Sequence, residues 1–482
     1  MTKQRGSLSQ CSAGTGFLGD GTTTTYKGST GWLLLLLEHC CRLVLLNATK
    51  LEQVMLQQRA KIQWLKGGDQ CSRVFFRKVA SRWASKRIFQ IQEEGGRTLS
   101  DPHEVVGKTI ITEGDTEALL KTVTATEVKR VFFDVEEEKA PSPDGYSAGF
   151  YKATWPIVGE KVTRAILEFF ITGKLLKQLN ATLLVLIPKV QAPSFVSEYR
   201  PIACSTVIYK VITKILVQRL SLVLDRLISP SQNAFLSGRS IWNNILLTQE
   251  LFTGYNQQRL PPRCALKVDL RKAYDSVERN FLLAVLDLFG FPVRFIQWIE
   301  ECVTTPSFSV CLNGTPHGFF TGARGLRQGD PMSPYFFVLV MEVLHLILAQ
   351  IIDQDDGFKF HWKFQEIGLF QLCFADDLLL FCRADESSVG VFKQGLETFA
   401  GLFGLQANPS KSNLIISASA RNMKEALLAL LDFREGTLPI KYLGLPLLSS
   451  RLTIADCKPL LTKVDGRIKG WAYVRLSFAG QV

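Results

Sequence analysis

Three carboxylates in two separate apolar segments could together support metal-dependent chemistry. Asp376 and Asp377 are adjacent and interrupt the otherwise apolar stretch 372–382, and Asp269 follows a second apolar segment at 264–268. A buried carboxylate without a partner costs roughly several kcal/mol, so a stable fold keeps such residues in a turn open to water or on bound cations.

The sequence around Asp376 predicts a strand, a turn and a second strand, so that both carboxylates would project from the turn. If segment 264–270 is a neighbouring strand, all three carboxylates converge, and hard oxygen ligands of this kind suit Mg²⁺. Two ions about 3.5–4 Å apart would activate a 3′-hydroxyl and stabilise a pyrophosphate leaving group, which is the chemistry of nucleotidyl transfer. An Asp-Asp pair alone is more typical of a surface turn, so other segments must add support.

Short apolar runs alternate with helical repeats, which predicts a mixed α/β (α+β) domain with a largely antiparallel sheet. Strands are expected at 183–187, 264–270, 308–312, 372–374 and 378–382, and helices at 205–228, 278–289, 334–349 and 391–403. Asn313-Gly314 is a strong hairpin signal before Phe319-Phe320, with an expected loop of more than two residues.

The composition fits a folded chain that binds a polyanion. Its 482 residues, 46% of them hydrophobic, are enough for two to four domains or subdomains. The net charge of +12 suits nucleic acid, although many soluble proteins carry such a charge. Eleven scattered cysteines without a Cys-x-x-Cys pair argue against a disulfide framework or a zinc site and indicate a reducing compartment.

Two apolar segments do not predict membrane spans, so no membrane partner is expected. Segment 32–46 is too short to cross a bilayer and three polar residues interrupt it. Segment 335–352 also contains three polar residues and is typical of a buried core helix. Residues 1–50 are rich in Gly, Ser and Thr and predict a disordered or unrelated leader.

Residues 51–180 predict a helical, basic extension. Within it, Phe75 and Phe76 lie among the arginines and lysines of segment 73–87. Aromatic rings among cations are typical of a surface that stacks on bases and contacts phosphates. The alternative is a solvated amphipathic helix whose aromatic residues are buried.

Eight sequence blocks carry a specific resemblance. They are Lys139-Ala-Pro-Ser-Pro-Asp-Gly145, Leu186-Ile-Pro-Lys189, Tyr199-Arg-Pro-Ile202, Leu266-Lys-Val-Asp-Leu-Arg-Lys-Ala-Tyr-Asp-Ser276, Gly325-Leu-Arg-Gln-Gly-Asp-Pro-Met-Ser-Pro334, Phe374-Ala-Asp-Asp377, Asn408-Pro-Ser-Lys411 and Tyr442-Leu-Gly-Leu-Pro446. In these blocks and their order, the chain from about residue 51 onward resembles the reverse transcriptase of plant LINE-type (non-LTR) retrotransposons, as part of a polyprotein.

The resemblance implies an RNA-directed DNA polymerase with a right-hand fold that adds dNTPs to a primer 3′-hydroxyl. The expected parts are a leader at 1–50, the extension at 51–180 with its 139–145 turn, fingers and palm at 181–447, and a truncated thumb at 448–482. The expected partners are an RNA template, a DNA primer or target and dNTPs. The cofactor would be Mg²⁺, as two ions that Mn²⁺ could replace, and the location a nucleus or a cytoplasmic ribonucleoprotein.

The resemblance also assigns the reacting centre. Asp269, Asp376 and Asp377 would hold the two metal ions, and the backbone of Leu270 would help to hold one of them. Lys411 matches a lysine proposed to protonate the leaving pyrophosphate.

The nucleotide pocket is assigned in the same way. Lys189 and Arg200 would neutralise triphosphate oxygens. Tyr274 would clash with a 2′-hydroxyl and so favour dNTPs, while Gln328 and Gly329 would line the pocket. The alternatives are an ordinary packed tyrosine and a solvated surface lysine.

The resemblance also implies a primer grip, and the chain differs from the family pattern in two ways. Tyr442, Leu443, Gly444 and Leu445 would form the primer grip. Ser142 stands where the family usually has glycine, which would cost about 1–2 kcal/mol if φ is positive there. No endonuclease, Cys-rich or RNase H pattern is recognisable.

Two rival readings remain open. One is a degenerate, element-derived protein that holds RNA but polymerises poorly or not at all. The other is a related reverse transcriptase, such as a group II intron maturase, although block 139–145 and block 325–334 fit the LINE branch better.

Overall fold

The computed structural model describes residues 111–137, 143–450, 462 and 466. The predicted leader, the basic segment 73–87, Ser142 and almost all of the predicted thumb lie outside these residues.

The helices are α4 (Glu113–Leu120), α5 (Ala125–Phe133), α6 (Ala148–Ala153), α7 (Trp155–Thr172), η2 (Val196–Glu198), α8 (Val207–Leu227), α9 (Ile241–Phe252), α10 (Ala273–Ser276), α11 (Arg279–Leu288), α12 (Val293–Thr304), α13 (Ser333–Gln354), α14 (Glu386–Phe403), η3 (Ala418–Met423) and α15 (Lys424–Leu431). The strands are β1 (Ala181–Pro188), β2 (Tyr199–Ser205), β3 (Cys264–Val268), β4 (Ser307–Leu312), β5 (Thr315–Thr321), β6 (Gln371–Phe374), β7 (Asp377–Cys382), β8 (Asn413–Ile416), β9 (Arg434–Glu435), β10 (Ile440–Tyr442) and β11 (Leu445–Leu447).

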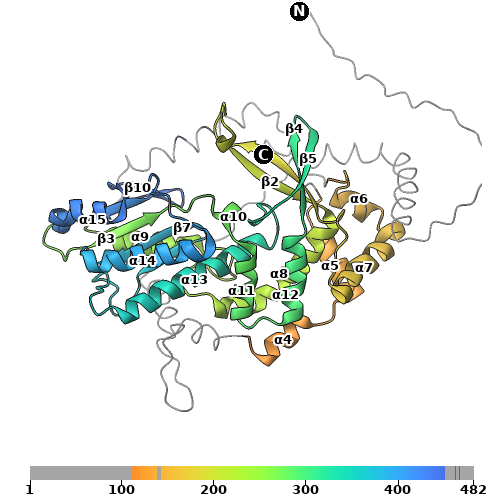
Figure 1. Cartoon of the computed structure of the whole chain (residues 1–482), viewed down its shortest axis with the longest axis horizontal. Helices are drawn as coiled ribbons and strands as arrows, with labels where there is room; N and C mark the ends of the chain where they lie inside the picture. Colours follow the sequence, from red (N-terminus) through yellow and green to blue (C-terminus); the bar gives the residue numbers. More distant parts are fainter. Residues whose placement is uncertain (1–110, 138–142, 451–461, 463–465, 467–482) are drawn as a thin grey trace, which may run out of the picture. The chain divides into compact units, whose positions relative to one another are not determined.

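The central sheet has five strands in the order β6-β7-β3-β8-β9 (Figure 1). All of its pairings are antiparallel except that of β8 with the short β9. The expected mixed α/β architecture with a largely antiparallel sheet is therefore confirmed. Strand β3 lies between β7 and β8. Its pairing with β7 brings together two segments that are more than 100 residues apart in the chain.

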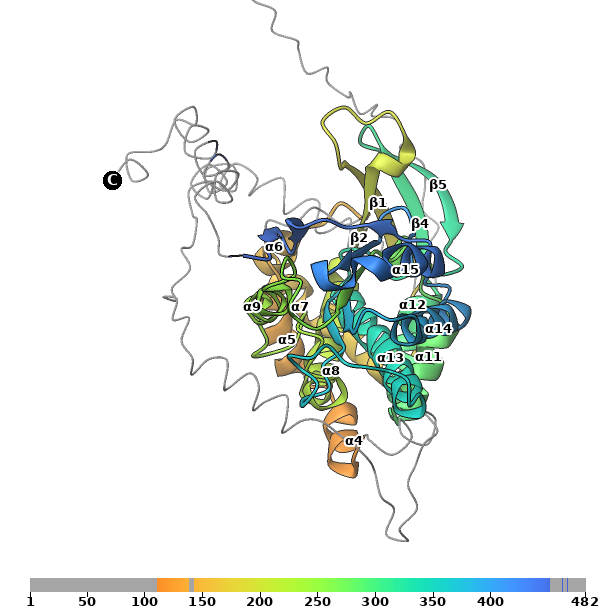
Figure 2. The ribbon, with the colours of Figure 1, turned by 90° about the vertical axis from the view of Figure 1, so that its left-hand side faces the viewer.

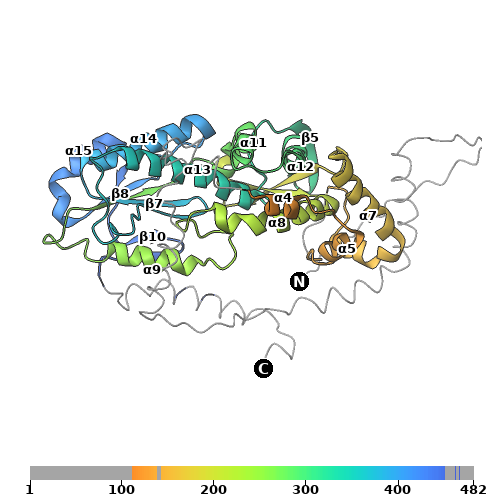
Figure 3. The same cartoon turned by 90° about the horizontal axis from the view of Figure 1, so that it is seen from below.

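Helices and a small hairpin cover the two faces of this sheet. Figure 3 shows α9 and β10 on one face of the sheet and α13 and α14 on the other. The core on the α9 face is formed by these buried residues: Leu247, Leu251, Phe252, Tyr255, Ala265, Leu369, Leu372, Leu379, Phe381, Ile415, Tyr442 and Leu447. Alternate side chains of each strand point to opposite faces, so the pleat divides β3 and β7 between two apolar layers.

A second sheet, with the order β2-β1-β4-β5, carries two hairpins (Figure 2). The expected loop of more than two residues after β4 is wrong, because β5 already begins at Thr315 and leaves only Asn313-Gly314 as the turn. Both turn residues have positive φ, as a tight hairpin turn requires. Gly318, with φ of 69°, lies at a register shift in β5, which is why this strand looks interrupted in the sequence.

Helix α13 is the one helix in the described part of the chain that is long and apolar enough to cross a membrane. Its most apolar 18-residue window is 67% buried inside the protein. The helix packs on α11 and α14. This burial is the one expected for a core helix.

Glu342 of α13 is fully enclosed, and burial raises the pKa of its carboxyl from 4.5 to about 7. Its Oε2 accepts a hydrogen bond of 2.9 Å from the Ser229 backbone N–H. Between these two pH values the folded chain holds a proton that the unfolded chain has lost. The contribution of Glu342 to stability therefore falls as pH rises from about 4.5 to about 7.

We expect Glu342→Gln to remove this pH dependence and to raise the free energy of unfolding at pH 8 by about 2–3 kcal/mol, because glutamine keeps an acceptor for Ser229 without the buried charge. Urea unfolding at pH 5 and pH 8 measures the effect. Glu397→Gln, at an exposed carboxylate paired with Lys393, is the control and should keep the wild-type profile. Equal pH profiles for all three proteins would contradict the assignment.

Candidate functional site

The strand register places the three predicted carboxylates at one end of the central sheet. The last residues paired between β3 and β7 are Val268 and Leu378. Asp269 directly follows β3 and Asp377 is the first residue of the antiparallel β7, so these two aspartates lie side by side at the same end of the sheet. Asp376 precedes Asp377 in the turn between β6 and β7.

The three carboxylates repel one another. Burial raises the pKa of Asp376 and of Asp377, even though the Asp376 side chain reaches solvent. The charge of Asp269 raises both pKa values further, and that of Asp376 also raises the pKa of Asp377. Lys267 opposes this effect at Asp377, but no ion pair joins any of the three to a described cation. This unbalanced negative charge favours a bound cation.

The donor set fits Mg²⁺ by its chemistry, since all three side chains offer hard carboxylate oxygens. Among the described residues, however, no three His, Cys, Asp or Glu side chains are already arranged to hold a metal ion. The backbones are thus placed next to each other, whereas the three side chains are not arranged around a shared ion.

Asp269 is held by the loop that carries Lys411. The Asn408 N–H donates to the Asp269 carbonyl at 2.7 Å, and the Asn408 Nδ2 donates to Oδ2 of Asp269 at 3.4 Å. The Asp269 N–H donates to the Ser412 hydroxyl at 3.1 Å. Lys411 is exposed in this loop and so lies on the chain segment bonded to Asp269. The sequence analysis gave no role to Asn408 or Ser412, although Asn and Ser side chains in loops often bond backbone groups.

Tyr274 lies beside the same site. Lys272, with φ of 44°, precedes α10, and Tyr274 in α10 stacks on Phe337 of α13 with ring centroids 4.7 Å apart. Burial, and after it the charge of Asp376, raises the pKa of the Tyr274 hydroxyl. Leu270 is buried and bridges to Ala407. Tyr274 is therefore both a packed residue and a neighbour of the turn at residues 375–377, the acidic turn.

Gln328 and Gly329 form a loop against β2. The Ala203 N–H donates to the Gln328 carbonyl at 2.7 Å, and Gln328 Nε2 donates to Asp275 Oδ1 at 3.4 Å. Gly329 has φ of 105°, and a Cβ there would lie 3.1 Å from the Ala203 carbonyl oxygen. Only glycine fits this close approach.

Lys189 and Arg200 are exposed at the end of the β1–β2 hairpin. Lys189 Nζ donates to the Ser197 carbonyl at 2.8 Å. Burial raises the pKa of Asp275, and the charge of Lys189 partly opposes this effect. Neither residue has a described contact with the three aspartates. The structure therefore puts Lys189 near the Gln328–Asp275 pair but does not join the hairpin cations to the acidic turn.

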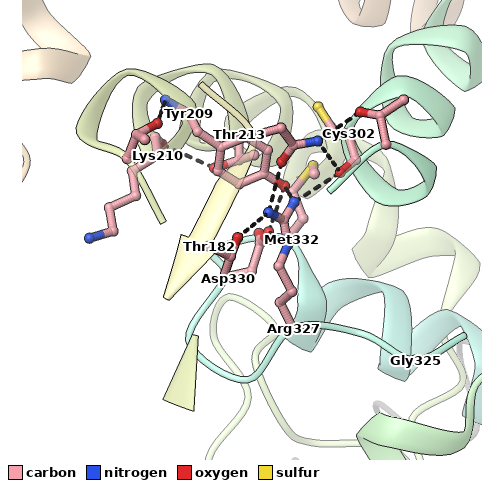
Figure 4. Close-up of polar contacts among 12 residues, drawn as sticks. Thr182, Tyr209, Lys210, Thr213, Cys302, Gly325, Arg327, Asp330 and Met332 are labelled. Atoms are coloured by element: carbon pink, nitrogen blue, oxygen red, sulfur yellow. Dashed lines mark hydrogen bonds and ion pairs between the residues drawn. The ribbon is translucent and has the colours of Figure 1, made fainter. Parts of the chain in front are cut away.

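Arg327, next to Gln328, is buried instead of facing a substrate (Figure 4). Its guanidinium forms an ion pair of 3.2 Å with Asp330, which in turn accepts a 2.6 Å hydrogen bond from the Tyr209 hydroxyl. It also donates to Asn180 Oδ1, Thr182 Oγ1, the Cys302 carbonyl and the Tyr209 hydroxyl. This network ties the Gln328 loop to β1, α8 and α12.

The predicted primer-grip residues form the β10–β11 hairpin. Leu443 and Gly444 make its turn with φ of 47° and 89°. Tyr442 is buried, and its hydroxyl accepts a 3.3 Å hydrogen bond from Asn244 Nδ2, which also donates to the Cys373 carbonyl at 2.8 Å. Asn244, which the sequence reading missed, therefore links this hairpin to β6 just before the acidic turn.

Sequence comparison with known proteins identifies the family of the region that holds this site. Residues 187–447 match the family described as reverse transcriptase (RNA-dependent DNA polymerase), and this range includes every predicted site residue. An uncharacterised 149 kDa protein of transposon TX1 from Xenopus laevis is 24% identical over 458 residues, covering 88% of this chain and 34% of that protein. The Pol polyprotein of the type-2 retrotransposable element R2DM from Drosophila melanogaster is 24% identical, covering 65% of this chain and 28% of its own length.

These relatives are much longer than this chain, which spans about a third of their length. Another relative matches a shorter stretch of this chain at higher sequence identity. An uncharacterised mitochondrial protein of Arabidopsis thaliana is 64% identical over 68 residues, which cover 14% of this chain and 54% of that protein.

Proposed function

This chain belongs to the reverse transcriptase (RNA-dependent DNA polymerase) family, in a domain of the non-LTR retrotransposon type, and from that premise we propose that it copies RNA into DNA. The observation that carries the proposal is the strand register that sets Asp269 beside Asp377, with Asp376 in the adjoining turn. Residues 181–447 would form the fingers and palm.

Asp269, Asp376 and Asp377 would hold divalent ions, with the Leu270 backbone as a further ligand. Bound Mg²⁺, or Mn²⁺ in its place, would activate the primer 3′-hydroxyl and neutralise charge on the leaving pyrophosphate. The carboxylates themselves would position the metal ions at this end of the central sheet. Lys411 would supply a proton to the leaving group from the loop bonded to Asp269.

The remaining assignments concern substrates. Lys189 and Arg200 would bind triphosphate oxygens, and Gln328 and Gly329 would line the nucleotide pocket. Residues 442–445 would support the primer end. The substrates would be dNTPs, a DNA primer and an RNA template, which the positive net charge of the chain would attract.

Tyr274 would select dNTPs by placing its ring where a 2′-hydroxyl would lie. We expect Tyr274→Val to lower the preference for dTTP over UTP, as a ratio of kcat/KM values, by about 10- to 100-fold. Single-nucleotide extension with each substrate measures it. Tyr335→Val, at another half-buried tyrosine, is the control. An unchanged ratio in Tyr274→Val would leave this residue with a packing role only.

We also propose that the chain is a segment of a LINE-type polyprotein of plant origin. The eight sequence blocks and the Arabidopsis similarity support this source.

Primer extension on poly(rA)–oligo(dT) with dTTP and Mg²⁺ tests the function. We expect processive or distributive dT addition by the purified full chain that EDTA abolishes and Mn²⁺ restores. A chain that binds this duplex but adds no nucleotide with either metal would instead be the RNA-holding remnant.

A further inference from the structure

The acidic turn contains a backbone conformation that its residue type does not favour. Ala375, directly before Asp376, has φ of 55°, in the left-handed region that L side chains rarely adopt. It is buried, and it links the last residue of β6 to the two aspartates. A residue in this conformation persists only where its surroundings hold it.

Two buried side chains hold the peptide groups of Ala375. Gln232 is 2% exposed, and its Oε1 accepts hydrogen bonds from the Ala375 N–H at 3.1 Å and the Ala234 N–H at 3.0 Å. Its Nε2 donates to the sulfur of Cys373 at 3.2 Å. The Cys373 thiol donates in turn to the Ala375 carbonyl at 3.0 Å. Both backbone polar groups of Ala375 are thus bonded by side chains that also bond each other.

The loop that carries Gln232 is itself anchored to β6. The Cys373 N–H donates to the Ser231 carbonyl at 2.8 Å, and the Asn233 N–H donates to the Cys373 carbonyl at 3.1 Å. Arg239 Nη1 donates to the Gln232 carbonyl at 2.6 Å and to the Ser229 carbonyl at 2.5 Å. These hydrogen bonds fix the backbone around Gln232, from which its side chain extends to the acidic turn.

We propose that Gln232 and Cys373 form a clamp that positions the metal-binding turn of this polymerase, an inference that rests on the proposed function. The clamp keeps Ala375 left-handed and so aims the adjacent carboxylates. Gln232 and Cys373 touch no reacting atom and act through the turn, which makes them positioning residues. Without the clamp, Ala375 would relax and the Asp376 side chain would move away from its neighbours.

Gln232→Met tests the clamp, since methionine has a similar length and lacks both polar atoms. We expect faster hydrogen exchange in the peptide that spans 371–380, at least five-fold weaker Mn²⁺ binding by electron paramagnetic resonance, and about 10- to 100-fold lower kcat. Gln249→Met is the matched control, because Gln249 also bonds two backbone groups, both on Leu448, away from the turn. This control should leave exchange in 371–380 unchanged.

A second comparison separates positioning from general stability. Glycine adopts positive φ without penalty, so Ala375→Gly should reduce the dependence of the turn on the clamp. The factor by which Gln232→Met lowers kcat and Mn²⁺ affinity should therefore be at least three-fold smaller in the Ala375→Gly background. The same factor in both backgrounds, or wild-type exchange and Mn²⁺ affinity in Gln232→Met, would overturn the proposal.

If Gln232→Met does not fold, Cys373→Ala and Cys373→Ser test the same clamp from its other side. Serine keeps a donor for the Ala375 carbonyl, so only Cys373→Ala should speed exchange and weaken Mn²⁺ binding, and equal behaviour of the two variants would refute the clamp. Hydrogen exchange and Mn²⁺ binding do not need polymerisation. A wild-type chain that binds Mn²⁺ but extends no primer would refute the proposed function, while these two measurements would still decide on the clamp.

Discussion

Replacing Asp376 by asparagine should lower kcat for dTTP addition on poly(rA)–oligo(dT) by at least about 1,000-fold, with duplex binding nearly unchanged. Asparagine keeps the size of the side chain and removes one of three charges that repel one another where β3 ends and β7 begins. It cannot replace a carboxylate as a ligand for a hard cation. Asp269→Asn should have a similar effect.

The matched control is Asp356→Asn, at an exposed aspartate outside the central sheet. It should keep wild-type kcat. Single-turnover extension together with fluorescence anisotropy of a labelled duplex separates chemistry from binding. If Asp376→Asn retained more than about a tenth of the wild-type rate, the carboxylate would have no essential part in the reaction.

The second large effect concerns stability. Arg327→Met should lower the free energy of unfolding by about 3–5 kcal/mol, because it leaves Asp330 buried without its cation and removes the donors to Asn180 and Thr182. The network in Figure 4 joins three elements, so its loss loosens the whole Gln328 loop. Urea unfolding at pH 7 measures the change.

Arg324 is a control from the same loop. It is exposed and makes one 3.6 Å ion pair with Glu278, so Arg324→Met should cost at most about 0.5 kcal/mol. Adding Asp330→Leu to Arg327→Met should recover part of the lost stability, since the uncompensated charge is then removed. Equal losses for Arg324→Met and Arg327→Met would show that burial of the ion pair is not the cause.

Local patterns predicted the elements that position the site. The apolar runs on both sides of Asp376 and Asp377 predicted β6 and β7, helical spacing predicted α8 and α14, and a nearly continuous apolar run predicted α13. The hairpin turn at Asn313-Gly314 was predicted correctly, but its loop was expected to be too long, because β5 contains Pro316 and Gly318, and an edge strand with a bulge accommodates both. Sequence patterns report local preference and say little about bulges.

The tertiary partners could not be predicted from such patterns. Gln232 and Ala375 are 143 residues apart, and Arg327 and Tyr209 are 118 residues apart. No periodicity marks a glutamine in a loop as the partner of a distant peptide group. An arginine beside a glycine-rich motif resembles a phosphate-binding residue until its buried acceptors are known. The resemblance to a family supplied the roles of Lys411, Tyr274 and residues 442–445, which stay predictions.

The central claim is that Asp269, Asp376 and Asp377 share divalent ions, and anomalous diffraction from crystals of the full chain with Mn²⁺, primer–template and a non-hydrolysable dTTP analogue tests it most directly. We expect two anomalous peaks, each with carboxylate oxygens from this trio among its ligands. Anomalous density that lies elsewhere, with Asp269 turned away from the other two aspartates, would contradict the account.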